Sequence, residues 1–228
     1  MKKLLFGVFA HPDDETFGPC GTFLTETANG TELYLISLTL GEAGNNPDNA
    51  PDLSTVREKE WRAAGEAMGA SALYTLGYQD GKLSNDSLQT INGQLVSLIG
   101  DIIRTHPEPV QAELLTFELN GISGHIDHIV AARAASYAFY TLKQQQLPMT
   151  RIRYYCKTLE QAPAIATAWL FSNPGYPPEL ISETIDARDY RDQIINIMQL
   201  HRSQREDFAW HIKNRSDQIG LDYYVVQS

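Results

Sequence analysis

Apolar runs and amphipathic segments alternate along the chain, in the way that buried strands and half-buried helices do. Residues 4–10 form a short apolar run, whereas residues 87–104 place apolar side chains at steps of three and four, in one stripe. The predicted strands are residues 4–10, 32–38, 72–76, 113–117, 151–156, 180–185 and 221–226, and the predicted helices are residues 17–29, 54–69, 87–104, 129–143 and 189–201. This alternation predicts βαβ units and a mostly parallel sheet, with residues 221–226 as a terminal edge strand.

The chain shows no internal repeat, no low-complexity tract and no linker, so residues 1–228 are expected to form a single domain. The pattern becomes irregular from about residue 157, and this part is expected to shape a substrate pocket. We interpret residues 1–10 as a strand and not as a signal peptide, because charged residues follow at once without a cleavage site.

Charge and cysteine content narrow the function classes. The formal net charge is −10, with 28 acidic against 18 basic residues, which disfavours nucleic acid and anionic membranes as partners. No apolar run approaches the length of a membrane span. Cys20 and Cys156 form no CxxC pair, which predicts buried free thiols and a cytoplasmic location.

Candidate chemistry begins directly after the first predicted strand, at His11-Pro12-Asp13-Asp14-Glu15. In open α/β sheets, ligands bind at this end of the strands. Adjacent carboxylates repel one another unless a cation neutralises them, and imidazole and carboxylate are ligands of divalent metals. Taken alone, Asp13 or Asp14 is equally compatible with a helix N-cap.

A second cluster, Gly124-His125-Ile126-Asp127-His128, follows another predicted strand and favours the metal interpretation. His11, Asp14 and one of the two later histidines supply the three ligands of a catalytic zinc site. Asp13 is placed to take the proton of a metal-activated water, the remaining histidine to stabilise the oxyanion or leaving group, and Asp127 to orient it.

These two motifs resemble the LmbE-like, PIG-L-type N-deacetylases. Lesser matches occur in the same order at Leu40-Gly41-Glu42-Ala43-Gly44, Arg57 with Glu60, Asp80, and His201-Arg202-Ser203-Gln204. The resemblance implies an α/β, Rossmann-like three-layer fold with helices on both faces of the sheet. The sequence departs from the family pattern at Ile126, where proline is usual, and at Cys20, where glycine is usual. Cys20 is therefore either an alternative ligand or a packed thiol.

The resemblance also implies a role for each matching residue. His11, Asp14 and His128 would bind zinc, Asp13 would be the base, and His125 the acid or oxyanion stabiliser, supported by Asp127. Glu42, Arg57 and Asp80 would contact the substrate; from residue type alone, Arg57 also fits a solvated helix face and Asp80 a plain turn. His201 fits a helix cap, and His211 gives no signal of function.

The expected activity is metal-dependent removal of an acetyl group from an N-acetylglucosamine-type sugar or a related small amide. The alternatives are an amidase that removes a larger acyl group from a thiol-sugar conjugate, and a metal-binding or sugar-binding module without turnover. Zn²⁺ is the expected cofactor, and Fe²⁺ suits the same ligands. The expected partner is a small N-acyl substrate, and a homo-oligomer is compatible with the sequence. Residues 45–53 and 161–178, including Trp169, are expected to set specificity.

Overall fold

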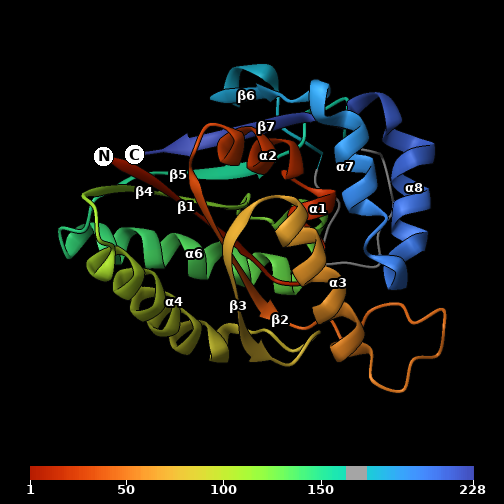
Figure 1. The fold of residues 1–228 in the computed structure, drawn as a ribbon, viewed down its shortest axis with the longest axis horizontal. Coiled ribbons are helices and arrows are strands. Elements are labelled where there is room, and N and C mark those ends of the chain that lie inside the picture. The colour runs from red at the N-terminus through yellow and green to blue at the C-terminus, as the bar shows by residue number, and fades with distance from the viewer. Residues whose placement is uncertain (163–173) are drawn as a thin grey trace.

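A seven-stranded sheet forms the middle layer of the computed structural model, which describes residues 1–162 and 174–228 (Figure 1). The strands are β1 (Lys2–Phe9), β2 (Glu32–Thr39), β3 (Ala70–Tyr78), β4 (Val110–Phe117), β5 (Met149–Cys156), β6 (Glu183–Asp186) and β7 (Leu221–Gln227). Their order in the sheet is β3-β2-β1-β4-β5-β7-β6, and β1 to β5 are parallel. The predicted α/β fold with a mostly parallel sheet is confirmed.

Helices cover both faces of the sheet, as expected. One face packs against α2 (Cys20–Ala28), α3 (Leu53–Ala67) and α7 (Arg191–Met198), and the other packs against α4 (Asn85–Thr105) and α6 (Ile126–Gln144). Alternate residues of β1 serve the two layers, because successive side chains of a strand point to opposite faces. Leu4 and Phe6 belong to the core beneath α4 and α6, whereas Leu5 and Phe9 belong to the core beneath α2 and α3.

The structure differs from the expected elements in four places. The helix predicted at 17–29 is divided into α1 (Asp14–Phe17) and α2, and Gly18 and Pro19 lie at the break, since proline cannot donate within a helix. The strand predicted at 180–185 is the shorter β6. β7 is not an edge strand, because it lies between β5 and β6. The helix α8 (Arg205–Arg215) was not predicted, and no side chain of it is fully buried.

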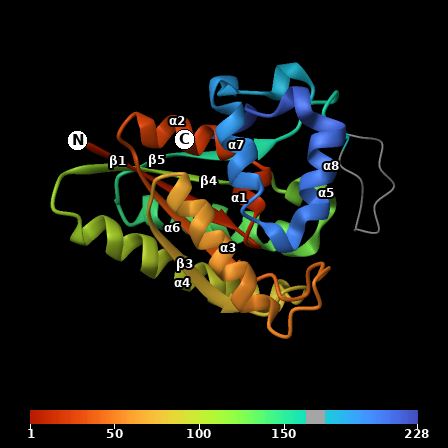
Figure 2. The same cartoon turned by 45° about the vertical axis from the view of Figure 1, so that its right-hand side comes forward.

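The crevice where a ligand would bind lies at the carboxyl ends of β1 and β4. The helices that follow these two neighbouring strands pack on opposite faces of the sheet. Such a reversal of strand order leaves a crevice between the loop after β1 and the loop after β4. Figure 2 shows α7 and α8 gathered over this end of the sheet, beside α1. In the described residues no helix is long and apolar enough to cross a membrane. Cys20 and Cys156 are buried free thiols, as expected.

Candidate active site

The loop after β1 and the loop after β4 each contain a residue in a strained backbone conformation. Asp13 has a φ of 115° and Ile122, in the kinked turn α5 (Gly121–Gly124), has a φ of 58°. Such angles cost a side-chain-bearing residue of order 1–3 kcal/mol and persist only where the surroundings hold them. In both loops a glutamate accepts the strained residue's backbone N–H: Glu15 Oε2 at 3.3 Å and Glu118 Oε1 at 2.8 Å.

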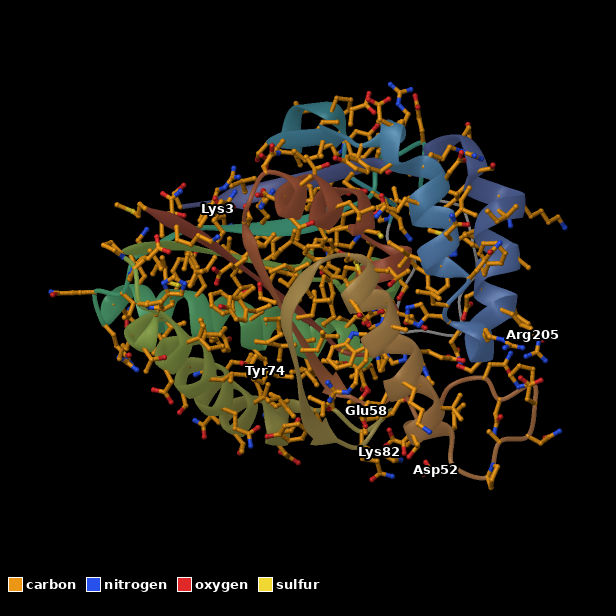
Figure 3. The ribbon with its side chains drawn as sticks, viewed as in Figure 1. Lys3, Asp52, Glu58, Tyr74, Lys82 and Arg205 are labelled. Atoms are coloured by element: carbon orange, nitrogen blue, oxygen red, sulfur yellow. The ribbon has the colours of Figure 1, made fainter. Side chains whose placement is uncertain are left out.

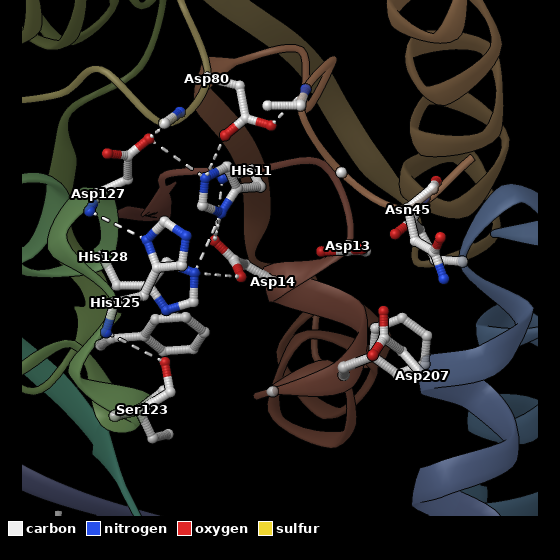
Figure 4. Close-up of a pocket in the computed structure, with 18 of the residues that line it drawn as sticks. His11, Asp13, Asp14, Asn45, Asp80, Ser123, His125, Asp127, His128 and Asp207 are labelled. Carbon is white, nitrogen blue, oxygen red and sulfur yellow. Dashed lines mark hydrogen bonds and ion pairs between the residues drawn. The ribbon is translucent and has the colours of Figure 1, made fainter. Parts of the chain in front are cut away.

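The loops bring three potential metal ligands to one point (Figure 4). His11 Nδ1 lies 3.1 Å from His128 Nε2 and 3.7 Å from Asp14 Oδ2, and His128 Nε2 lies 3.2 Å from Asp14 Oδ1. Ligands of a tetrahedral zinc with bonds of about 2.1 Å stand about 3.4 Å apart. The two nitrogens and the Asp14 carboxylate therefore lie close enough for one ligand set, with each nitrogen nearest a different carboxylate oxygen, although 117 positions separate the two histidines.

Contacts of the opposite ring nitrogens orient the two rings, so that His11 Nδ1 and His128 Nε2 are directed toward this point. His11 Nε2 lies 2.9 Å from Asp80 Oδ1 and 3.5 Å from Asp127 Oδ2, at ion-pair distance but without hydrogen-bond geometry, so the two carboxylates favour a proton on Nε2 electrostatically. His128 Nδ1 donates to Gly121 O at 3.1 Å. A histidine that binds a metal generally donates its other N–H in this way.

The electrostatic environment favours a cation at the same point. Burial alone would lower the pKa of His11, but Asp127, Asp80 and Asp14 raise it to about 10. Burial would raise the pKa of Asp14, yet His128 and His11 hold it far below its usual range. Both shifts show that this cluster attracts positive charge, so its donors fit a divalent metal.

Two groups of described side chains, neither of which contains Asp14, place single ligand atoms within 4.8 Å of one another: His11 with His125 and His128, and His11 with Asp80 and Asp127. The first group contains no carboxylate to balance the charge of an ion. In the second group backbone N–H groups already occupy the carboxylates. Ala43 donates to Asp80 at 2.9 Å, and Gly81 donates to Asp127 at 2.7 Å.

Asp13, the candidate base, is mostly buried, with 13% of its side chain exposed, and is held by Arg57. Arg57 Nη2 donates to Asp13 Oδ2 at 2.8 Å and to Pro12 O at 2.7 Å, and Nη1 donates to Gly41 O at 2.8 Å. Burial raises the pKa of Asp13, although the Arg57 guanidinium opposes the rise. A base is most effective when its pKa is near the working pH, so this environment suits proton transfer.

His125 is held as a neutral hydrogen-bond donor. The backbone N–H of Asp127 donates to His125 Nδ1 at 3.1 Å, which leaves the ring proton on Nε2. Burial and the nearby His128 and His11 lower the pKa of His125 to about 4. Asp127 was expected to support this ring with its carboxylate, but that group faces His11, and the support comes from the backbone.

The residues expected to contact substrate have different surroundings. Asp80 and Arg57 line the cavity, but both also hold the site together through the contacts described above. Glu42 is not among the lining residues, and its Oε1 accepts from the backbone N–H of Asp80 at 2.9 Å. Cys20 is buried outside the cavity, which agrees with a packed thiol.

The cavity itself measures about 640 Å³, a normal size for a small-molecule site. Its wall includes Lys157, Gln204, Asp207 and His211, which all lie in the part from about residue 157 that was expected to shape the pocket. Of these four, only Gln204 was singled out in the sequence, as the last residue of a motif match. Asp207 faces the cavity opposite the histidine cluster in Figure 4. No spacing in the sequence marks Lys157, Asp207 and His211 individually, because α8 and the end of β5 bring them to the cavity. Trp169 and most of the segment 161–178 lie outside the described residues.

The model of the family described as GlcNAc-PI de-N-acetylase, PIG-L, matches residues 6–139, which is more than half of the chain. The chain belongs to the PIG-L family. This confirms the resemblance drawn from the two motifs and identifies the chain as an enzyme of the deacetylase class, a hydrolase of amide bonds. The matched residues contain both loops of the site but not α7, α8 or β7.

Two relatives extend the match over the rest of the chain. The chain is 27% identical to a probable N-acetyl-alpha-D-glucosaminyl L-malate deacetylase of Bacillus anthracis, over 86% of this chain and 79% of the relative. It is 28% identical to a 1D-myo-inositol 2-acetamido-2-deoxy-alpha-D-glucopyranoside deacetylase of Acidothermus cellulolyticus, over 99% and 89%.

Solved structures share the fold. An N,N'-diacetylchitobiose deacetylase from Pyrococcus horikoshii superposes with a TM-score of 0.65 at 17% identity, over 99% of this chain and 83% of that one. A 4-carboxy-2-hydroxymuconate hydratase from Pseudomonas putida gives a TM-score of 0.70 at 15% identity, over 100% and 97%. Because one fold carries both reactions, the fold alone does not define the chemistry.

Proposed function

We propose that this enzyme removes the acetyl group from an N-acetylglucosamine conjugate with a divalent metal bound by His11, Asp14 and His128. The observation that carries the proposal is the convergence of His11 Nδ1, His128 Nε2 and the Asp14 carboxylate, within 3.7 Å of one another, beside Asp13. A zinc ion at such a site lowers the pKa of a bound water from 15.7 to about 7 and polarises a carbonyl oxygen.

Side chains of the protein provide proton transfer and stabilisation of the developing negative charge. Asp13 accepts the proton of the attacking water, since its carboxylate lines the cavity and Arg57 fixes its orientation. His125 Nε2–H donates to the amide oxygen as negative charge develops there. The amide C–N bond breaks, Asp13 passes the proton to the leaving nitrogen, and the products are acetate and a free amine.

The identity of the metal is part of the proposal. Two imidazoles and one carboxylate suit Zn²⁺ and Fe²⁺ alike, and we propose Zn²⁺ for the enzyme. The test is to remove the metal with a chelator and add back each ion, Fe²⁺ under anaerobic conditions. We expect acetate release to disappear on removal and to return with Zn²⁺.

The substrate is a conjugate and not free N-acetylglucosamine in our proposal, because a cavity of about 640 Å³ accommodates a drug-sized ligand. The two relatives act, by their names, on conjugates of different chemistry, with malate or with inositol. Acetate release should be measured on a panel of N-acetylglucosaminides, with free N-acetylglucosamine as the comparison.

The expected result is metal-dependent acetate release that is fastest with a conjugate. Full activity after Asp13→Ala would refute the assigned mechanism. A panel of N-acyl chain lengths separates this proposal from an amidase for larger acyl groups. If the metal-loaded enzyme turned over no amide at all, a binding module without turnover would replace the proposal.

A further inference from the structure

Lys157 introduces a cation into the cavity one strand beyond the metal-binding loops. It directly follows β5 and lines the same cavity as His11 and His128. The pairs Gly7–Leu115 and Phe117–Tyr155 place His11 and Lys157 at the same level, with β4 between them. Since neighbouring strands are about 4.8 Å apart, the two backbones are about 10 Å apart along the sheet edge. One sugar ring with its substituents bridges such a distance.

No carboxylate of the described residues forms an ion pair with Lys157. Glu118 is the acid that acts on it electrostatically, but its oxygens are engaged elsewhere. Glu118 Oε2 accepts from Asn120 N at 2.8 Å and from the Tyr176 hydroxyl at 3.1 Å, and Oε1 holds the strained Ile122. Lys157 therefore lines the cavity as a partly buried amine that forms no ion pair with a carboxylate of the described residues, and Glu118 acts on it only through its electrostatic field.

A second cation, Arg215 at the end of α8, strengthens this positive region. It is held in place because Nη2 donates to Gln161 O at 2.9 Å and the guanidinium lies 4.9 Å from the centre of the Trp210 ring. Burial and the positive charge of Arg215 lower the pKa of Lys157 to about 7. The positive charges of Lys157 and Arg215 repel one another, and an anion bound beside them would relieve this repulsion.

We propose that Lys157, with Arg215 behind it, binds an anionic group, a carboxylate or a phosphate, on the part of the substrate that is not acylated. This inference rests on the proposed function and narrows it, because it selects charged conjugates over neutral ones. It also gives the C-terminal third of the chain a defined role in specificity.

The test compares matched substrates that differ only in charge: the carboxymethyl and carbamoylmethyl N-acetylglucosaminides, and a phosphonomethyl analogue for the phosphate arm. We expect kcat/KM of the zinc-loaded enzyme to be about tenfold higher for at least one anionic substrate than for the neutral one, as a charge-assisted hydrogen bond provides. The preferred anion identifies which of the two groups the subsite takes.

The variants separate this role from a structural one. Lys157→Gln should bring the ratio of anionic to neutral kcat/KM near one, whereas Lys157→Arg should keep most of the preference. Lys213→Gln is the matched control, since Lys213 is exposed on α8 and does not line the cavity, and it should keep the wild-type ratio. Turnover of all three substrates at equal kcat/KM would overturn the subsite and leave the deacetylase proposal intact.

If no substrate is hydrolysed, the proposed function fails and the subsite is tested by binding. Calorimetric titration of the metal-loaded enzyme with the carboxymethyl, phosphonomethyl and carbamoylmethyl glucosaminides then replaces kinetics. Tighter binding of an anionic ligand that is lost in Lys157→Gln would support the subsite, and equal affinities for all three would overturn it.

Discussion

The two sides of the cavity are built in different ways. On one side, short loops after β1 and β4 carry the proposed metal ligands, and His11, Asp14 and Asp127 are buried. On the other side, α8 and the end of β5 supply Asp207, His211 and Lys157, of which Asp207 is exposed and the others are partly exposed. The buried side is suited to fixing reacting groups, whereas the open side is suited to selecting substrates.

The open side is held in place by contacts with the loop before α3. Gln204 Nε2 donates to Asn45 O at 2.9 Å, and Arg205, labelled in Figure 3, forms two 2.8 Å contacts with Asp48. Surface ion pairs such as that of Arg205 contribute little to stability. Single changes in the loops after β1 and β4 should reduce kcat strongly, because these loops carry the proposed reacting groups. Single changes on the α8 side should mainly alter KM.

The largest effect is expected for His128→Ala, which removes one of the three proposed ligands. Turnover should fall by at least about a thousandfold, because the metal's several kcal/mol of charge stabilisation are lost. Metal content by atomic spectroscopy should fall in parallel. His106→Ala is the control, since His106 pairs with Glu32 away from the cavity. A fully active His128→Ala enzyme would exclude this ligand set.

The next effect is expected for Asp13→Asn, which keeps the shape of the side chain and removes the base. We expect kcat to fall by about 10²–10⁴, the usual contribution of a positioned base. Bound metal should stay at the wild-type level, because Asp13 is not one of the proposed ligands. Loss of the metal in this variant would place Asp13 among the ligands instead.

Arg57→Gln tests whether Arg57 positions the base or binds the sugar. A positioning role predicts a fall in kcat with little change in KM, and a sugar-binding role predicts the reverse. The free energy of unfolding should fall by about 1–3 kcal/mol, because buried carbonyls of Pro12 and Gly41 lose their donor. Arg62→Gln, on the exposed face of α3 beside Glu58, is the control.

The pH profile of Arg57→Gln sharpens the same test. The base is active when ionised, so kcat/KM should be lost as the pH falls through the pKa of Asp13. The positive charge of Arg57 lowers that pKa. Removing the charge should therefore move the acid limb of the profile to higher pH, while Arg62→Gln should leave it in place. An unmoved limb would show that Asp13 is not the group that titrates.

The smallest effect is expected for Asp207→Asn on the open side. Loss of one hydrogen bond to a neutral hydroxyl corresponds to an increase in KM of about two- to tenfold, with kcat nearly unchanged. Asp192→Asn, on an exposed position of α7, should leave both constants at wild-type values. A large fall in kcat for Asp207→Asn would contradict the division between the two sides of the cavity.

The lesser motif matches show why short patterns do not reveal roles. Glu60 on α3 accepts hydrogen bonds from the backbone N–H and the hydroxyl of Ser203, at 2.9 Å and 2.6 Å. These bonds connect α3 to the turn Arg202–Gln204 that precedes α8. His201 is buried beneath the first motif, with Nε2 3.0 Å from Thr16 Oγ1, and it stands at the N-cap of the turn Arg202–Gln204 without a capping hydrogen bond from its side chain. Both matches support the loops and do not face the cavity.

The sequence by itself determined the fold class and the set of residues that we propose as metal ligands. Both follow from local rules: strands and helices have distinct apolar periods, and the candidate ligands lie within a few residues of a strand's end. Only the tertiary structure decided which nitrogen of each histidine faces the ion, and that the Asp127 carboxylate faces His11. Those contacts depend on distances between segments more than 40 residues apart, as Gly81 N to Asp127 shows.

The wall of the cavity was likewise decided by tertiary structure alone. α8 lacks a buried face, so no apolar period marks it, and its position depends on contacts with a loop about 160 residues earlier in the chain. Asp207, His211 and Lys157 are ordinary polar residues in the sequence. They line the cavity only because β5 and α8 bring them to the loops that carry the proposed metal ligands.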